Sequence, residues 1–146
     1  MNPADLFMTS LVLWRENRGG GTVGMQSVAN AIQHRVAANH STFYEECTKH
    51  LQFSSITAPG DPQLALWPIS SDPTWVEAQN LAAQAVGGTL ADLVMGAELY
   101  YDPGGIKTTK SITLPTGQTV PFPQTWNPAV VEFTVAIAGH YFFKQK

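Results

Sequence analysis

The stretch Leu13-Trp14-Arg15-Glu16-Asn17-Arg18-Gly19-Gly20-Gly21 places a glutamate between two arginines and directly before three glycines. The residues before it predict a helix over 3–18, capped by Asn2, with Pro3 in its first turn. The glycines end that helix, so Glu16 lies in its last turn, where the negative end of the helix dipole favours a raised carboxyl pKa. A glutamate at the lip of a cleft, beside a backbone that a ligand can approach closely, suits general acid chemistry.

The composition predicts one folded domain over residues 1–146. The chain is 44% hydrophobic and 13% charged, which supports a packed core. A net charge of -3 with scattered basic residues argues against nucleic-acid binding. The lone Cys47 excludes an internal disulfide and is expected to be a small buried residue. The N-terminus has neither signal-peptide features nor a membrane-spanning run, so we expect cytoplasmic synthesis without a signal peptide and no membrane insertion.

The order of predicted elements is helices first and a small antiparallel sheet last, which is an α+β fold. Further helices are expected over about 23–39, from Ser41 to about Lys49, and from Asp72-Pro73 to Gly87-Gly88. A long irregular stretch over 52–71 separates the last two and is either functional or mobile. Strands are expected at 99–101, in a hairpin of 112–114 with 118–122, at 131–137, and at 141–143 after a turn at Gly139-His140.

Other kinds of site find little support in the spacing of the residues. One cluster comprises His34, His40, Cys47 and His50, and it matches no HExxH or CxxC pattern. We expect polar surface or capping histidines, no metal and no cofactor, and a zinc amidase is the weakest alternative. No GxSxG nucleophile motif or nucleotide-binding loop occurs. Among the carboxylates, Glu16 stands out, because the others on helices fit an ordinary exposed pattern: Glu45, Glu46 and Glu77.

Several short segments carry a family resemblance through their order and spacing. They are Trp14-Arg15-Glu16-Asn17-Arg18-Gly19, Gly24 to Val36, Gln52-Phe53-Ser54, Asp72-Pro73-Thr74-Trp75 and Gly96-Ala97-Glu98-Leu99-Tyr100-Tyr101-Asp102-Pro103. Together they resemble the bacterial and phage cell wall hydrolase family that includes the spore-cortex-lytic enzymes, with a family-like core over about 3–105. The tail, about 106–146, is similar to that of phage-type members, and forms either an extra wall of the cleft or a docking surface.

The resemblance implies a lysozyme-like fold and cleavage of peptidoglycan glycan strands between N-acetylmuramic acid and N-acetylglucosamine, by a lytic transglycosylase or muramidase. The family's catalytic glutamate is the first in a Gly-Glu-Ala-Arg-Gly-Glu-like signature and falls on Glu16, which would act as the single general acid and base. A hydrolytic route would need a second carboxylate, for which Asp102 and Glu98 are the candidates. The expected substrate-binding residues are Gln52, Ser54, Tyr100, Tyr101 and Asp102.

The sequence departs from the family signature at three positions. Gly20 replaces the second signature glutamate, Arg15 replaces the first glycine, and His34 replaces an asparagine of the following helix. Arg15 is then a candidate to tune the pKa of Glu16 in place of the missing acid. The loss of that acid also supports an alternative function. In this alternative the chain is a non-catalytic cell-wall-binding protein or a phage virion structural protein that keeps the lysozyme-like fold.

The resemblance also sets the expected partners and place of action. The partners are peptidoglycan glycan strands, together with phage tail or virion proteins if a phage or prophage encodes the chain. The protein would then act on the cell wall after release, as an endolysin, or as part of a phage particle.

Overall fold

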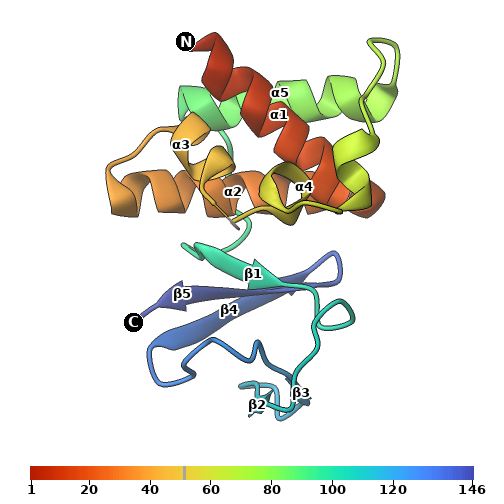
Figure 1. Ribbon diagram of the computed structural model, residues 1–146. Helices are drawn as coiled ribbons and strands as arrows, with labels where there is room; N and C mark the ends of the chain where they lie inside the picture. The colour runs from red at the N-terminus through yellow and green to blue at the C-terminus, as the bar shows by residue number, and fades with distance from the viewer. Residues whose placement is uncertain (51) are drawn as a thin grey trace.

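The computed structural model describes residues 1–50 and 52–146, which form a helical lobe and a β lobe stacked on one another (Figure 1). The helical lobe contains α1 (Pro3–Asn17), η1 (Arg18–Gly20), α2 (Gly21–Asn39), α3 (Phe43–Thr48), α4 (Ser54–Thr57), η2 (Pro62–Ala65) and α5 (Pro73–Gly87). The β lobe contains β1 (Leu99–Tyr101), β2 (Ser111–Thr113), β3 (Thr119–Pro121), β4 (Val131–Ile137) and β5 (His140–Gln145). The predicted α+β order, with the sheet last, is confirmed.

The first helix is built as its sequence predicts. Asn2 caps α1 by accepting a hydrogen bond from the Ala4 backbone N–H at 2.8 Å. The glycines that follow form the single turn η1, and Gly21 has a φ of 67°, which lets the chain reverse into α2 two residues earlier than expected. Glu16 therefore lies in the last full turn of α1, at the edge of the helical lobe.

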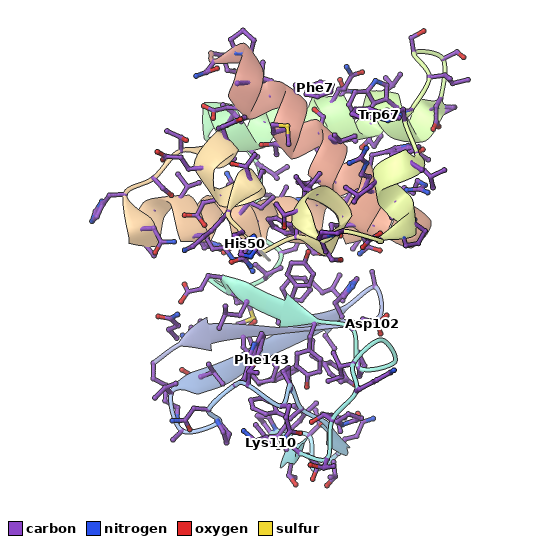
Figure 2. The ribbon with its side chains drawn as sticks, viewed as in Figure 1. Phe7, His50, Trp67, Asp102, Lys110 and Phe143 are labelled. Atoms are coloured by element: carbon purple, nitrogen blue, oxygen red, sulfur yellow. The ribbon has the colours of Figure 1, made fainter. Side chains whose placement is uncertain are left out.

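The core of the helical lobe lies where α1, α2 and α5 meet. Leu13 and Val28 are fully buried there, and Trp14 packs beside them. The Trp14 indole donates a hydrogen bond at 3.0 Å to Asp72, the residue that caps α5, so the start of α5 is tied to α1. Phe7 lies on the outside of this lobe and is 48% exposed (Figure 2).

The β lobe contains an antiparallel sheet of order β1-β5-β4 and a separate hairpin of β2 with β3. Its aromatic core gathers around Tyr101, Phe122 and Phe143. Figure 2 labels Phe143 within the β lobe. The expected turn at Gly139-His140 is wrong by one residue, because Ala138 and Gly139 take the two positive φ values of the hairpin, 49° and 81°. His140 is consequently the first residue of β5.

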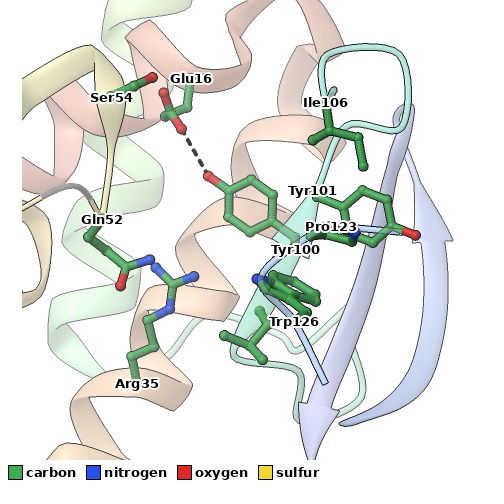
Figure 3. Close-up of a pocket in the computed structure, with 10 residues that line it drawn as sticks. Glu16, Arg35, Gln52, Ser54, Tyr100, Tyr101, Ile106, Pro123 and Trp126 are labelled. Atoms are coloured by element: carbon green, nitrogen blue, oxygen red, sulfur yellow. Dashed lines mark hydrogen bonds between the residues drawn. The ribbon is translucent and has the colours of Figure 1, made fainter. Parts of the chain in front are cut away.

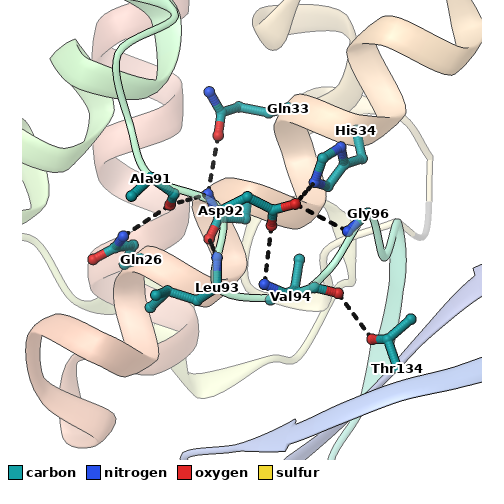
Figure 4. A network of polar contacts seen from close by, with 10 residues as sticks. Gln26, Gln33, His34, Ala91, Asp92, Leu93, Val94, Gly96 and Thr134 are labelled. Atoms are coloured by element: carbon teal, nitrogen blue, oxygen red, sulfur yellow. Dashed lines mark hydrogen bonds and ion pairs between the residues drawn. The ribbon is translucent and has the colours of Figure 1, made fainter.

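The two lobes are joined by apolar packing and by a polar network. Fully buried Phe142 of β5 packs with Ala31 of α2 and with Val94 and Ala97 of the connection between the lobes. In the network, Asp92 accepts hydrogen bonds from the backbone N–H groups of Val94 and Gly96 and pairs with His34 at 3.1 Å (Figure 4). These contacts fix the connection against α2, and thereby fix the spacing between the lobes.

Candidate active site

A cleft of about 450 Å³ lies between the two lobes. Its helical wall is formed by Glu16, Arg35, Gln52 and Ser54, and its β wall by Leu99, Tyr100, Tyr101, Ile106, Pro123 and Trp126 (Figure 3). The structure thus brings five of the six predicted site residues to one cleft: Glu16, Gln52, Ser54, Tyr100 and Tyr101. These residues are up to 85 positions apart in the chain, so only the stacking of the lobes brings them together.

Glu16 is half-buried, and its carboxylate accepts a hydrogen bond at 3.2 Å from the Tyr100 hydroxyl (Figure 3). Burial raises the pKa of Glu16 above its usual value, although the hydroxyls of Ser55 and Tyr100 act in the opposite direction. The negative charge of Asp61 adds to the increase, and the positive charge of Arg35 opposes it. The net result is a carboxyl group that holds its proton to a higher pH than an exposed glutamate, as a general acid requires.

Tyr100 is held in place by its ring and its hydroxyl. The ring lies 5.4 Å from that of Phe142 and 5.2 Å from that of His140, measured between centroids. The His140 ring accepts a hydrogen bond at 3.2 Å from Asn17, which directly follows Glu16. Burial, together with the negative charge of Glu16, raises the pKa of Tyr100 well above its usual value, so its hydroxyl remains a donor to Glu16.

Replacing Tyr100 with phenylalanine is expected to lower the rate of glycan cleavage about tenfold, because one hydrogen bond to a charged group is lost. The Tyr100 hydroxyl lowers the pKa of Glu16, so its removal raises that pKa. Because the acid must be protonated, the alkaline limb of the pH–rate profile moves to higher pH. Rate profiles of wild type, Tyr100→Phe and the exposed control Tyr44→Phe measure this. An alkaline limb that stays in place in Tyr100→Phe would contradict the role given to the hydroxyl.

Arg15 does not tune Glu16, and that hypothesis is wrong. Its guanidinium donates to the backbone oxygens of Ser55 and Leu66 and lies over the Trp67 ring, 4.6 Å from the centroid. It therefore pins the segment over 52–71 against α1. The start of that stretch lines the cleft through Gln52 and Ser54, and the stretch carries the short helices α4 and η2.

The cation in the cleft is Arg35, which the sequence did not single out as a site residue. Arg35 is 6% exposed, and its Nε donates to the Glu98 backbone oxygen. With the Gln52 amide turned so that its oxygen faces the guanidinium, both terminal nitrogens of Arg35 donate to it, at 2.9 and 3.2 Å. The signal in the sequence was a single arginine on the buried stripe of α2, where an unpaired cation is costly.

Asp102 and Glu98 do not line the cleft, contrary to the roles predicted for them. The exposed Asp102 side chain accepts a hydrogen bond from the Gly104 backbone at 2.9 Å and closes the turn after β1. A carboxylate oxygen of Glu98 accepts from the Gln145 backbone at 3.0 Å. Glu16 is therefore the only carboxylate among the lining residues that the structure describes.

Part of the tail over 106–146 forms a wall of the cleft, which is one of the two roles expected for it. Ile106, Pro123 and Trp126 all line the β wall. The Trp126 ring packs edge-on to Tyr101, with 5.5 Å between the centroids. Sequence reasoning found the segment around Trp126 through its resemblance to phage-type tails, but gave it no place in the site.

Gly20, which replaces the second signature glutamate, packs against the Asn17 side chain. A Cβ atom at position 20 would lie 2.6 Å from Asn17 Oδ1, and one at Gly24 would lie 2.8 Å from Asn17 Nδ2. Asn17 is 8% exposed and occupies the space between these glycines while it donates to His140. A larger residue at position 20 therefore requires Asn17 to move.

The side chains of the histidine and cysteine cluster noted in the sequence do not form a common site. His34 faces Asp92, His40 caps the C-terminus of α2, and the buried Cys47 thiol has its pKa raised to about 12 by burial. Within residues 1–50 and 52–146, no group of three or more His, Cys, Asp or Glu side chains is arranged to hold a metal ion. None of the helices in these ranges is both long enough and apolar enough to cross a membrane.

Comparisons with known proteins bear on the fold. No protein-family model and no curated protein matches the sequence. A solved structure that does match is the catalytic domain of the germination-specific lytic transglycosylase SleB from Bacillus anthracis. The TM-score is 0.67 at 20% sequence identity, over 99% of this chain and 97% of that one, so the likeness includes both lobes. The chain therefore has the lysozyme-like α+β fold of that catalytic domain, as the resemblance in its motifs predicted.

Proposed function

We propose that this protein cleaves peptidoglycan glycan strands between N-acetylmuramic acid and N-acetylglucosamine, with Glu16 as general acid and base. The observation that carries the proposal is the position of Glu16, a half-buried carboxyl of raised pKa in the cleft between the lobes. The fold supports it, because the matching solved structure is a lytic transglycosylase domain. The resemblance of the motif around Glu16 to the catalytic signature of cell wall hydrolases points to the same residue.

In the first step, protonated Glu16 donates its proton to the glycosidic oxygen. The bond from C1 of N-acetylmuramic acid to that oxygen breaks, and N-acetylglucosamine leaves with a free 4-hydroxyl group. The muramic ring passes through an oxocarbenium-like state. Glu16 is then an ionised carboxylate, and the Tyr100 hydroxyl, 3.2 Å away, stabilises its new charge.

In the second step, the 6-hydroxyl of the same muramic unit attacks C1. Its proton passes to the Glu16 carboxylate, which restores the acid and leaves a 1,6-anhydro ring on the product. This lytic transglycosylase route needs one carboxylate, and Glu16 is the one that lines the cleft in the described part of the chain. A hydrolytic route would use a water molecule activated by a second acid.

The remaining lining residues supply the contacts that hold a glycan. The amide of Gln52 and the hydroxyl of Ser54 lie on the helical wall and suit the acetamido and hydroxyl groups of the sugars. On the β wall, the aromatic side chains of Tyr101 and Trp126 offer apolar surfaces against which sugar rings pack.

The identity of the released fragments tests the proposed reaction. Purified peptidoglycan is incubated with the protein, and the soluble products are analysed by mass spectrometry. We expect anhydro-muropeptides, which weigh one water less than the hydrolytic products. Reducing muropeptides would contradict the transglycosylase route and indicate a muramidase. Release of nothing, with binding to the wall retained, would favour the alternative of a non-catalytic wall-binding or virion structural protein.

We also propose a phage or prophage origin, with action on the wall after release or within a phage particle. The support is the similarity of the tail, including Pro121 to Trp126, to phage-type members of the resembled family. Mass spectrometry of purified phage particles from the source cells tests whether the protein is part of the particle. Detection of the protein only in the lysate, outside the particles, would favour an endolysin.

A further inference from the structure

A second pocket, of about 160 Å³, adjoins the cleft at its helical side. It is lined by residues from α2, α3 and the ends of β1 and β5, and it shares Arg35, Gln52 and Leu99 with the cleft. The two pockets are therefore neighbours, with a shared wall formed by these three residues. The proposed glycan cleavage uses only the larger pocket.

The second pocket contains a buried carboxylate with an unused oxygen. Glu46 is 3% exposed, so the prediction that it lies on an exposed helical face is wrong. One carboxylate oxygen accepts from the side chains of Asn39 and Ser41, while the other has no hydrogen-bond partner in the described structure. Burial works against its charge, but these hydrogen bonds and the positive charges of Lys49 and Arg35 together lower the pKa of Glu46, so it is ionised at neutral pH. A buried acceptor of this kind calls for an N–H donor.

The same pocket offers donors for an anion. Arg35 has five N–H groups, of which one binds Glu98 and two bind Gln52, which leaves one on each terminal nitrogen. No carboxylate lies within salt-bridge distance of it in residues 1–50 and 52–146. The exposed Lys49 ammonium lines the pocket as well. The lining thus presents unused positive donors beside two carboxylates, those of Glu46 and Glu98.

We propose that this second pocket binds the peptide stem of the muramic acid unit whose bond is cleaved, a role that rests on the proposed function. The stem branches from the lactyl group of that sugar, and the second pocket adjoins the cleft at Arg35. A stem carboxylate binds Arg35 and Lys49, and a stem amine lies beside the Glu46 carboxylate, which lines the same pocket.

The proposal is tested by binding, measured calorimetrically, of two probes that contain no bond of the cleaved type. One is N-acetylglucosaminyl-N-acetylmuramic acid carrying a tetrapeptide stem, and the other is the same disaccharide without the stem. Wild type is expected to bind the stem-bearing probe about tenfold more tightly. Lys49→Ala is expected to lose about fivefold of that preference, since an exposed ion pair contributes modestly. Lys144→Ala should keep it, because Lys144 pairs with Glu132 of β4 and does not line the pocket.

Glycan cleavage is measured in parallel on intact strands and on strands stripped of stems by an amidase. Cleavage of both with equal KM, and equal binding of the two probes, would overturn the stem pocket and leave the proposed function standing. If binding depends on the stem but neither kind of strand is cleaved, the result would support stem binding by the second pocket and contradict the proposed glycan cleavage. A stem preference unchanged in Lys49→Ala and in Glu46→Gln would also overturn the assignment, because the preference would then arise elsewhere.

Discussion

Glu16→Gln is expected to lower the rate of glycan-strand cleavage about a thousandfold, within the range that general acid catalysis contributes. Glutamine keeps the shape of the side chain and still accepts the Tyr100 hydrogen bond, but it has no proton to donate to the glycosidic oxygen. Because the proposed mechanism uses Glu16 in both steps, bond cleavage and ring closure should be lost together. The measurement is the initial rate of release of soluble fragments from purified peptidoglycan.

Glu77→Gln is the matched control, because it makes the same chemical change on α5, away from the cleft lining. It should keep the wild-type rate. Binding to peptidoglycan should persist in Glu16→Gln, since the other lining residues are unchanged. Activity of Glu16→Gln within a few-fold of wild type would contradict the assignment and direct attention to a lysozyme-like shell with another use.

The same substitution has a stability signature whose sign follows from the pKa of Glu16. Burial raises that pKa in the folded state, so folding favours the protonated form, and the stability that this gives is lost as the pH rises through the folded pKa. Glutamine does not titrate. Thermal unfolding should therefore show a higher Tm for Glu16→Gln than for wild type at pH 8, with the difference shrinking as the pH falls through the folded pKa and levelling off below the pKa of an unfolded glutamate. A difference independent of pH would contradict a raised pKa.

Phe142→Ala is expected to lower the free energy of unfolding by about 3–5 kcal/mol, the usual range for removing a buried phenylalanine. Phe142 is fully buried where the sheet meets α2, and its ring lies 5.4 Å from that of Tyr100. The cavity would weaken the join between the lobes and also release the ring that holds Tyr100 against Glu16. Such a loss is a large part of the stability of a small domain.

Chemical denaturation measures this effect, and Phe7→Ala is its control. Phe7 makes an edge contact with Trp75 but is 48% exposed, so its removal is expected to cost about 1 kcal/mol or less. Phe142→Ala should also lose glycan cleavage under conditions where it remains folded. Equal losses of stability in the two variants would show that the interface between the lobes is not the site of strong packing that the structure indicates.

Local sequence signals predicted the elements well where caps and glycines fix them. Asn2 and Asp72 begin α1 and α5 through side-chain hydrogen bonds to the backbone two residues on, and Gly88 ends α5 in a left-handed conformation. One error concerned the turn before β5, where neighbouring residues could each occupy the two turn positions. His140 was expected in the turn before β5, but Ala138 and Gly139 take the turn positions. That single shift puts His140 between Asn17 and Tyr100.

By itself, the sequence determined the order of helices and strands, the position of Glu16 at the end of α1 and its candidacy as the acid, because caps, periodicity and glycines act over a few residues. The tertiary structure alone decided which groups surround Glu16. Burial, the hydroxyls of Ser55 and Tyr100, and the charges of Asp61 and Arg35 set its pKa, and these groups come from segments far apart in the chain. It also removed Asp102 and Glu98 from the cleft and buried Glu46. Electrostatics and burial depend on distances in space, which residues far apart in the chain acquire only on folding.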